Sequence, residues 1–221
     1  MTTLKAHLQA ILNLGRGVIS GMPDPTGQEH PMDLFREWYD TAEESGLFLP
    51  EAMTLATATP EGRPSARMVL MKGADRDGFT FFTNYGSRKA RELDGNPHAA
   101  LVFHWAVLER QVRVEGPVDR LSESDSFDYF RTRPRGSRIG AWASDQSRPL
   151  KDRGTLQARV EEVEERFHDR DEIPIPPFWG GYRLIPRVME FWQGRASRLH
   201  DRWVFAREGP DDPWTISRLY P

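Results

Sequence analysis

One short segment near the C-terminal end gathers cationic and titratable side chains at alternating positions. Arg198, His200 and Arg202 are separated from one another by single residues. Because successive side chains of a β-strand point to opposite faces, a strand here would place all three on one face. Two forked guanidiniums beside an imidazole suit a phosphorylated ligand that exchanges protons. A solvated basic edge strand is the alternative, and the nearby Trp192 favours a binding site.

A second candidate site lies where a predicted strand gives way to a helix. The strand ends near Thr83, and Ser87, Arg88 and Lys89 begin the helix after a glycine-containing turn. Free N–H groups and a partial positive charge at a helix start attract anions, whereas cations there oppose the helix dipole. A bound phosphate removes that conflict, so we interpret Arg88 and Lys89 as phosphate ligands. The alternative is a solvated helix start.

A third group combines a phenol, a guanidinium and a hydroxyl. Tyr129 and Arg133 are four residues apart, which places them on one face of a helix predicted to begin after Ser122, and Ser137 follows the break at Pro134. Together these groups suit a phosphate clamp. The many arginines of this stretch would also suit nucleic acid, but the acidic overall charge argues against that class.

Short strands and a few helices must position these residues. Leu8, Ile11 and Leu12 suggest a first helix within a peripheral segment, 1–31, and Asp33 is the expected cap of the next helix. Patterning predicts helices near 33–45, 87–93, 122–131, 137–143 and 150–168, and strands over 53–59, 65–72, 79–83, 99–105 and 110–120, with four more within 181–217. Gly116-Pro117 indicates a bulge or an edge position. Residues 32–221 therefore predict one mainly β (α+β) domain, an antiparallel barrel with helical additions.

Composition narrows the class of protein. The 221 residues, 38% hydrophobic and 29% charged, predict a soluble globular protein with a substantial core. No apolar run is long enough to cross a membrane. Cys is absent, which excludes thiolate chemistry and agrees with a cytoplasmic location, and a net charge of −3 disfavours nucleic acid. We expect no membrane partner, no nucleic-acid partner and no metal.

Together the motifs resemble one family, the FMN-dependent pyridoxine/pyridoxamine 5′-phosphate oxidases. The resemblance covers roughly residues 33–221 and rests on the motifs above together with Arg67-Met68-Val69-Leu70-Met71-Lys72, Phe191-Trp192-Gln193-Gly194-Arg195 and the closing Arg218-Leu219-Tyr220-Pro221. It implies an FMN-binding split β-barrel. It also implies oxidation of pyridoxamine and pyridoxine 5′-phosphate by O2 to pyridoxal 5′-phosphate, with release of H2O2. A homodimer with FMN at the subunit interface is the implied assembly.

The resemblance also assigns roles to individual residues. The implied FMN contacts are Arg67, Met68, Val69, Leu70, Met71, Lys72, Phe82, Thr83, Arg88, Lys89, Gln111, Gln146, Ser147, Trp192 and Arg202. The implied substrate contacts are Lys72, Tyr129, Arg133, Ser137, Arg198 and His200, the last two being catalytic. Whether His200 transfers a proton or orients the substrate is open at this point. Gln111, by itself, would be an ordinary surface amide.

Two features separate this chain from its relatives. Some family members carry Arg-x-x-Tyr near the N-terminus, where it closes over the ligand; Arg16-Gly17-Val18-Ile19 lacks the Tyr, which leaves such a lid unsupported. Related flavoenzymes of phenazine biosynthesis usually lack the Lys that matches Lys72, so its presence favours the vitamin B6 activity. The alternatives are a flavin oxidase of the same fold with another small substrate, and a non-catalytic flavin- or pyridoxal-phosphate-binding protein.

Overall fold

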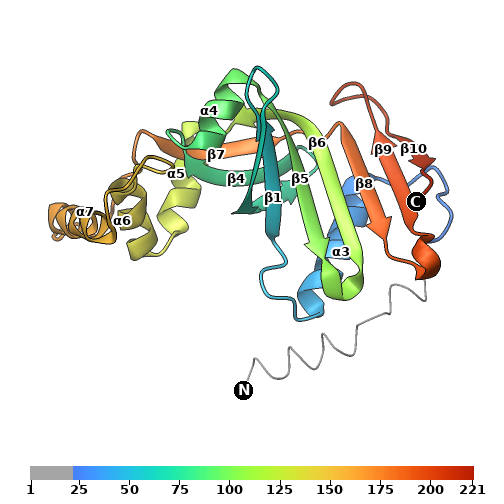
Figure 1. Cartoon of the computed structure of the whole chain (residues 1–221), viewed down its shortest axis with the longest axis horizontal. Coiled ribbons are helices and arrows are strands. Elements are labelled where there is room, and N and C mark those ends of the chain that lie inside the picture. Colours follow the sequence, from blue (N-terminus) through green and yellow to red (C-terminus); the bar gives the residue numbers. More distant parts are fainter. Residues whose placement is uncertain (1–21) are drawn as a thin grey trace.

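The computed structural model describes residues 22–221, so the predicted helix around Leu8 and the segment at Arg16 lie outside the described residues. One antiparallel sheet has the main order β10-β9-β8-β6-β5-β1-β2, and a branch of β3, β4 and β7 joins it at β6 (Figure 1). Its strands are β1 (Ala52–Ala58), β2 (Pro64–Leu70), β3 (Gly73–Asp75), β4 (Gly78–Asn84), β5 (His98–Trp105), β6 (Arg110–Arg120), β7 (Trp179–Leu184), β8 (Val188–Gln193), β9 (Asp201–Ala206) and β10 (Thr215–Arg218). The helices are α3 (Pro31–Glu44), α4 (Arg88–Gly95), α5 (Glu123–Thr132), α6 (Arg135–Ala143) and α7 (Arg153–Arg166), with single 3-10 turns at Ala106–Leu108 and Ala196–Arg198. The predicted antiparallel barrel with helical additions is confirmed.

Strand β6 connects the two parts of the sheet. Its first half pairs with β8 and its last residues pair with β7, while β5 accompanies it on the other side. Gly116 lies where the partner changes, and a Cβ there would collide with the carbonyl oxygen of Ile185. The glycine therefore permits a close backbone approach inside the sheet, and the predicted edge position is wrong.

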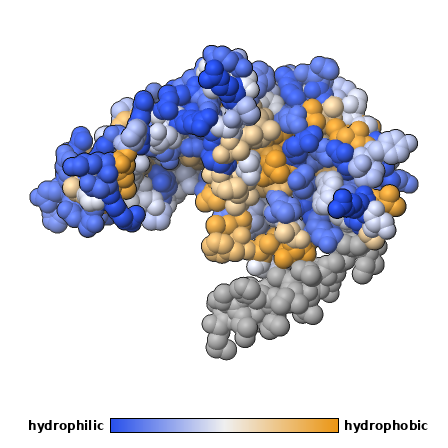
Figure 2. All heavy atoms as spheres, viewed as in Figure 1, coloured by the Kyte–Doolittle hydropathy of each residue, from blue (hydrophilic) through white to orange (hydrophobic). Residues whose placement is uncertain are grey.

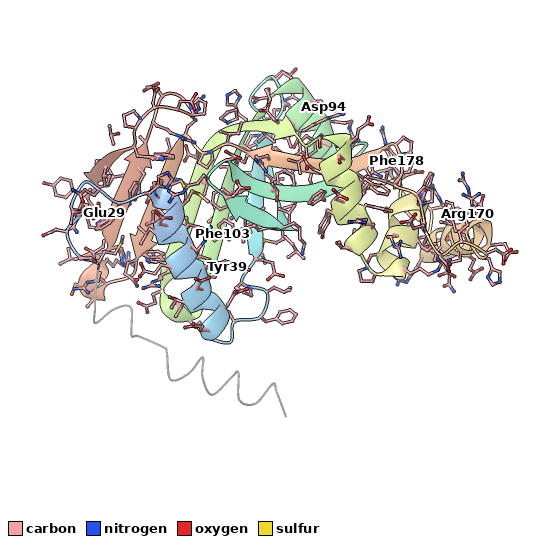
Figure 3. The ribbon with its side chains drawn as sticks, turned by 180° about the vertical axis from the view of Figure 1, so that it is seen from behind. Glu29, Tyr39, Asp94, Phe103, Arg170 and Phe178 are labelled. Atoms are coloured by element: carbon pink, nitrogen blue, oxygen red, sulfur yellow. The ribbon has the colours of Figure 1, made fainter. Side chains whose placement is uncertain are left out.

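Helix α3 covers the core face of the sheet. Its Phe35 ring lies 4.8 Å from that of Phe79 and 5.0 Å from that of Phe103, and Trp38 lies 5.3 Å from Phe191. Figure 3 shows this helix, which carries the labelled Tyr39, in front of the sheet. Burial of such rings supplies the main stabilisation of the sheet. The first turn of α3 is capped by His30, not by the predicted Asp33.

His30 caps the helix through its ring. The backbone N–H of Met32 donates to His30 Nδ1 at 3.1 Å, while the Asp33 carboxylate pairs with Arg76 at 2.7 Å. Desolvation, followed by the nearby Arg76 charge, lowers the pKa of His30. The neutral ring is therefore favoured, and it is the form that can accept the capping hydrogen bond.

No helix of residues 22–221 covers the opposite face of the sheet, and this face is partly apolar (Figures 1 and 2). Met68 is 63% exposed there and Leu70 is 37% exposed. Paired neighbours form a row across the sheet that comprises Met68, Thr54, Val102, Arg113, Glu190 and Val204. We call this surface the bare face. Exposed apolar patches of this kind mark interaction surfaces.

Helices α5 to α7 form an arm beside the β4–β7 branch (Figure 1). The outer part of the arm has its own small core of Ile139, Phe167 and Ile173. Trp142 joins this core and donates a hydrogen bond from its indole to the Pro174 carbonyl at 2.8 Å. No helix within 22–221 is both long and apolar enough to cross a bilayer.

Candidate active site

A pocket of about 670 Å³ opens between the free edge of β2, the end of β4 and the arm. Residues from strands β2, β4 and β7, from helices α4, α5 and α6 and from segments between them line it. Those predicted as site residues are Met68, Val69, Leu70, Lys72, Phe82, Thr83, Lys89, Tyr129, Arg133, Ser137 and Gln146. Three motifs that lie far apart in the sequence therefore meet around one volume, large enough for ligands of ordinary cofactor size.

One end of this pocket carries a buried ammonium. Lys89 is 9% exposed, and its Nζ donates to Thr83 Oγ1 and to Gln146 Oε1, both at 3.1 Å. Desolvation, followed by the charge of Arg67, lowers the pKa of Lys89 to about 8. Within the described residues no carboxylate lies at ion-pair distance from it. An anionic ligand would supply the missing negative charge.

The start of α4 frames this end as predicted. Ser87 caps the helix by accepting from the Ala90 N–H, and Arg88 follows with a side chain that is 59% exposed. Arg67 lies on the neighbouring strand β2, and its Nη1 donates to the Leu55 carbonyl at 3.0 Å. Arg67 and Arg88 do not line the pocket themselves. Both contact the buried carboxylate of Glu92, a residue that sequence reasoning missed.

The other end of the pocket carries a further cation, Arg133, which has no carboxylate partner in the described part of the chain. Arg133 lies 4.7 Å from the Trp179 ring, and its Nη1 is buried without a hydrogen-bond partner among the described residues. Desolvation lowers the pKa of Arg133. We predicted that Arg133 lies within the helix with Tyr129. Helix α5 ends at Thr132, however, and Arg133 is its C-terminal cap. It nevertheless shares the pocket with Tyr129 and Ser137.

Aromatic stacking fixes Tyr129 at this end. Its ring lies 4.0 Å from the Phe82 ring and 6.2 Å from the Trp179 ring, in both cases nearly parallel. Burial raises the pKa of Tyr129, so the phenol stays protonated and can donate a hydrogen bond. Trp179 was missed as a site residue, because a Trp after the proline-rich connector carries no recognisable signal of its own.

The floor between the two ends is the unpaired edge of β2. Among the described strands β2 pairs only with β1, and Met68, Val69 and Leu70 line the pocket along that edge. Main-chain donors and acceptors there are available to a planar, hydrogen-bonding ring system. Met71, by contrast, is in the hydrophobic core and does not line the pocket.

The remaining predicted residues lie on the bare face or beside it. Gln111, Trp192 and Arg202 are direct neighbours across β6, β8 and β9. The His200 ring lies 4.5 Å from the Trp192 ring. None of these side chains lines the 670 Å³ pocket. Ser147 follows Gln146 in a turn with φ of 68° and likewise does not line it.

The predicted strand through Arg198, His200 and Arg202 is wrong. Ala196–Arg198 forms a 3-10 turn, with positive φ at Ser197 and Arg198, and β9 begins only at Asp201. Alternation along a strand therefore cannot place these three side chains on one face. The turn, not a strand, presents Arg198.

Hydrogen bonds fix the direction of His200 and Arg202. His200 Nδ1 accepts from the Arg195 N–H at 3.1 Å, so the neutral ring carries its proton on Nε2. Arg202 donates from Nε to Glu190 at 2.8 Å and from Nη1 to the Tyr220 carbonyl at 3.0 Å. No cluster of His, Cys, Asp and Glu in the described part of the chain could hold a metal ion.

Comparisons with known proteins agree with this geometry. The family described as pyridoxamine 5′-phosphate oxidase matches residues 42–167, and the pyridoxine 5′-phosphate oxidase C-terminal dimerisation region matches residues 179–221. The pyridoxine/pyridoxamine 5′-phosphate oxidase of Psychromonas ingrahamii is 52% identical over 216 residues, 98% of each chain. That of Rubrobacter xylanophilus is 55% identical over 202 residues, 91% of this chain and 92% of its own.

A solved structure shows the same fold. PhzG from Burkholderia lata 383, in complex with tetrahydrophenazine-1-carboxylic acid, has a TM-score of 0.84 and 33% sequence identity, covering 93% of this chain and all of its own. The split barrel and the family expected from the motifs are thereby confirmed. With matches to both of its regions and relatives above half identity, the chain belongs to the pyridoxamine 5′-phosphate oxidase family.

Proposed function

We propose that this protein binds FMN and oxidises pyridoxamine and pyridoxine 5′-phosphate to pyridoxal 5′-phosphate. O2 is the final acceptor and yields H2O2; the amine substrate also takes up water and releases ammonia. The observation that carries the proposal is one pocket lined by three cations, Lys89 at the α4 end, Arg133 on the arm and Lys72 after β2, none of which pairs with a carboxylate among the described residues. Two phosphorylated ligands that meet inside the pocket would supply the negative charge that these cations lack. The lack of cysteine fits a cytoplasmic enzyme.

FMN fits the α4 end and the edge of β2. Arg88 and Lys89 would hold its phosphate, Thr83 and Gln146 would complete that end, and the main chain of Met68–Leu70 would face the ring system. When bound, FMN supplies the two-electron acceptor for the hydrogen that leaves C4′ of the substrate. The protein's part is to neutralise the phosphate and to hold the two ligands in reacting orientation.

The arm end fits the substrate phosphate. Tyr129, Arg133 and Ser137 belong to this part of the pocket lining, and Lys72 lines the same pocket from the end of β2. Together they offer cationic donors and neutral hydroxyls. Arg198 and His200 would orient the rest of the substrate. Because His200 Nδ1 accepts the Arg195 N–H, the neutral ring offers Nε2–H as a donor and has no free lone pair to act as a base. We therefore assign His200 to orientation.

The site is complete only in a homodimer with FMN between subunits. Arg198, His200, Trp192 and Arg202 belong to the stretch that matches the dimerisation region, and they do not line the pocket of their own chain. Met68 lines the pocket and lies on the bare face, so pocket and bare face are continuous. An isologous contact through this face would place one subunit's Arg198 turn against the other subunit's pocket.

Subunit complementation tests this shared site. Arg133→Ala and Arg198→Ala are each expected to reduce activity strongly, because each leaves substrate contacts unmade. A mixed dimer, isolated with a different tag on each variant, should recover about half of the native activity, since one of its two sites then has both arginines. Mixed dimers as inactive as the parent variants would mean that both arginines of a site come from one chain.

Anaerobic titration tests the function itself. Addition of pyridoxamine 5′-phosphate to the FMN-loaded protein without O2 should bleach the visible flavin absorbance, and admission of air should restore it with formation of H2O2. A protein that binds FMN but is not bleached would be a flavin carrier or an oxidase of another substrate. Tetrahydrophenazine-1-carboxylic acid, the ligand of the PhzG structure, is the matched comparison substrate; bleaching by it alone would favour that class instead.

A further inference from the structure

Glu92 is a buried carboxylate on which four donors converge. It lies on α4, one turn after Arg88, and is 5% exposed. Its Oε2 accepts from Ser65 Oγ at 2.6 Å, from Arg67 Nη2 at 3.1 Å and from the Thr57 hydroxyl. Its Oε1 accepts from Arg88 Nε at 2.8 Å. A helix carboxylate four residues after an Arg is ordinarily a solvated surface group, whereas this one is enclosed between α4 and strands β1 and β2.

Glu92 is charged throughout the physiological range. Burial acts to raise its pKa, but hydrogen bonds from Ser65, Thr57, Arg88 and Arg67 outweigh burial and lower the pKa of Glu92 to about 2. A full negative charge therefore lies beside the cations that would receive a phosphate. Such a charge weakens phosphate binding through space, unless it also organises the groups that hold the phosphate.

The two arginines use Glu92 differently. Arg67 donates from Nη1 to the Leu55 carbonyl and to Thr57, and from Nη2 to Ser65 and Glu92. Both of its Nη groups are therefore hydrogen-bonded to other parts of the protein. Arg88 uses only Nε for Glu92, and its side chain remains 59% exposed. Among the described residues its two Nη groups have no hydrogen-bond partner. Glu92 thus fixes the direction of the Arg88 fork and leaves the fork open for a ligand.

We propose that Glu92 is a positioning residue for the FMN phosphate, which it serves by orienting Arg88. The proposal rests on the proposed FMN site. It competes with a simpler role, in which Glu92 only balances the charges of Arg67, Arg88 and Lys89. The two roles predict opposite signs: without the negative charge, FMN binds more tightly if Glu92 only balances charge, and more weakly if it positions Arg88.

Two substitutions separate these roles. Glu92→Gln removes the charge and keeps the shape, whereas Glu92→Asp keeps the charge and withdraws the carboxylate from Arg88. Positioning predicts that both variants bind FMN about tenfold more weakly, the scale of one charge-assisted hydrogen bond. Affinity for riboflavin, which lacks the phosphate, should stay at the native value in both. Fluorescence titration of the apoprotein measures all of these affinities. If Glu92→Gln does not fold, the FMN affinity of Glu92→Asp by itself distinguishes the two roles.

A double-mutant cycle tests whether Glu92 acts through Arg88. In an Arg88→Ala background, Glu92→Asp should change FMN affinity less than twofold, because the residue that it orients is gone. Tighter or unchanged FMN binding in Glu92→Asp, an equal loss for riboflavin, or the same loss in the Arg88→Ala background would each overturn the proposal. A native protein that does not distinguish FMN from riboflavin would instead refute the FMN phosphate site itself.

Discussion

Pyridoxamine 5′-phosphate should be oxidised with kcat/KM on the order of a thousandfold above that of unphosphorylated pyridoxamine. Tyr129, Arg133 and Ser137 line the pocket from the arm and Lys72 lines it from the end of β2, and we propose that the four bind one dianion. Pyridoxamine cannot replace those hydrogen bonds, and it would leave the buried Nη1 of Arg133 unpaired. Loss of two bonds at roughly 2 kcal/mol each accounts for a factor of that size.

The Arg133→Ala substitution tests whether this preference for the phosphorylated substrate arises at Arg133. The substitution should lower kcat/KM for the phosphorylated substrate by roughly tenfold to a hundredfold and scarcely change the value for pyridoxamine. Arg131→Ala is the matched control, because Arg131 is 60% exposed, pairs with Asp128 and does not line the pocket. If the native enzyme used both substrates equally well, the arm end would not be the phosphate site, even with the flavin chemistry intact.

The residue groups at both ends of the pocket could be recognised in the sequence, because each group lies within a short segment. The helix start at Ser87 follows from capping and from the glycine turn, and it brings Arg88 and Lys89 to the end of β4 without reference to the rest of the fold. Tyr129, Arg133 and Ser137 likewise lie within a few residues of one helix end. What the sequence could not supply from the residues themselves is that these two ends face one pocket, which depends on the order of strands in the sheet.

The segment around Arg198 was mispredicted for a physical reason. Basic residues at every second position, Arg198, His200 and Arg202, resemble one face of a strand. However, Ser197 and Arg198 adopt positive φ, which interrupts an extended chain. The segment also makes a contact that is distant in the sequence, because the Met22 N–H donates to the Asp201 carboxylate at 3.1 Å. Periodicity contains no information about such contacts.

Glu92 was missed because its role depends on burial. In the sequence it is one acidic residue among the charges of Arg88–Asp94 and is most simply read as part of a solvated helix face. Only the packing of α4 against β1, together with the Ser65 and Arg67 side chains of β2, encloses it. The grouping of Gln111, Trp192 and Arg202 likewise needed the β6–β8–β9 register, and their proposed partner is a pocket on another copy of the chain.

Replacement of both Arg88 and Lys89 by Ala should nearly abolish the contribution of the phosphate to FMN affinity. Two charge-assisted bonds of roughly 1.5–3 kcal/mol each correspond to FMN binding about a hundredfold to ten-thousandfold more weakly. Riboflavin should bind the double variant as it binds the native protein, and added salt should weaken native FMN binding more than riboflavin binding. Arg63→Ala, which removes an exposed charge from the turn between β1 and β2 and does not touch the pocket, is the control and should leave the FMN affinity unchanged.

The pH dependence of FMN affinity isolates the contribution of Lys89. Its pKa is lowered to about 8 in the ligand-free protein, and a phosphate dianion binds the protonated ammonium better than the neutral amine. FMN affinity should therefore be highest below pH 8 and should fall as the pH rises above it, by up to about tenfold per pH unit, because binding then requires uptake of one proton. The ratio of FMN to riboflavin affinity removes any titration that the two ligands share.

Lys89→Arg provides the decisive comparison. A guanidinium keeps its proton throughout this range, so the FMN-to-riboflavin ratio of the variant should stay flat between about pH 7 and pH 9.5 while the native ratio falls. A native ratio that is flat over the same range would mean that the Lys89 ammonium does not contact the phosphate. An equal fall in both proteins would assign the titration to another group. Only a fall confined to the native protein places the phosphate on Lys89, at the buried end of the pocket next to Thr83 and Gln146.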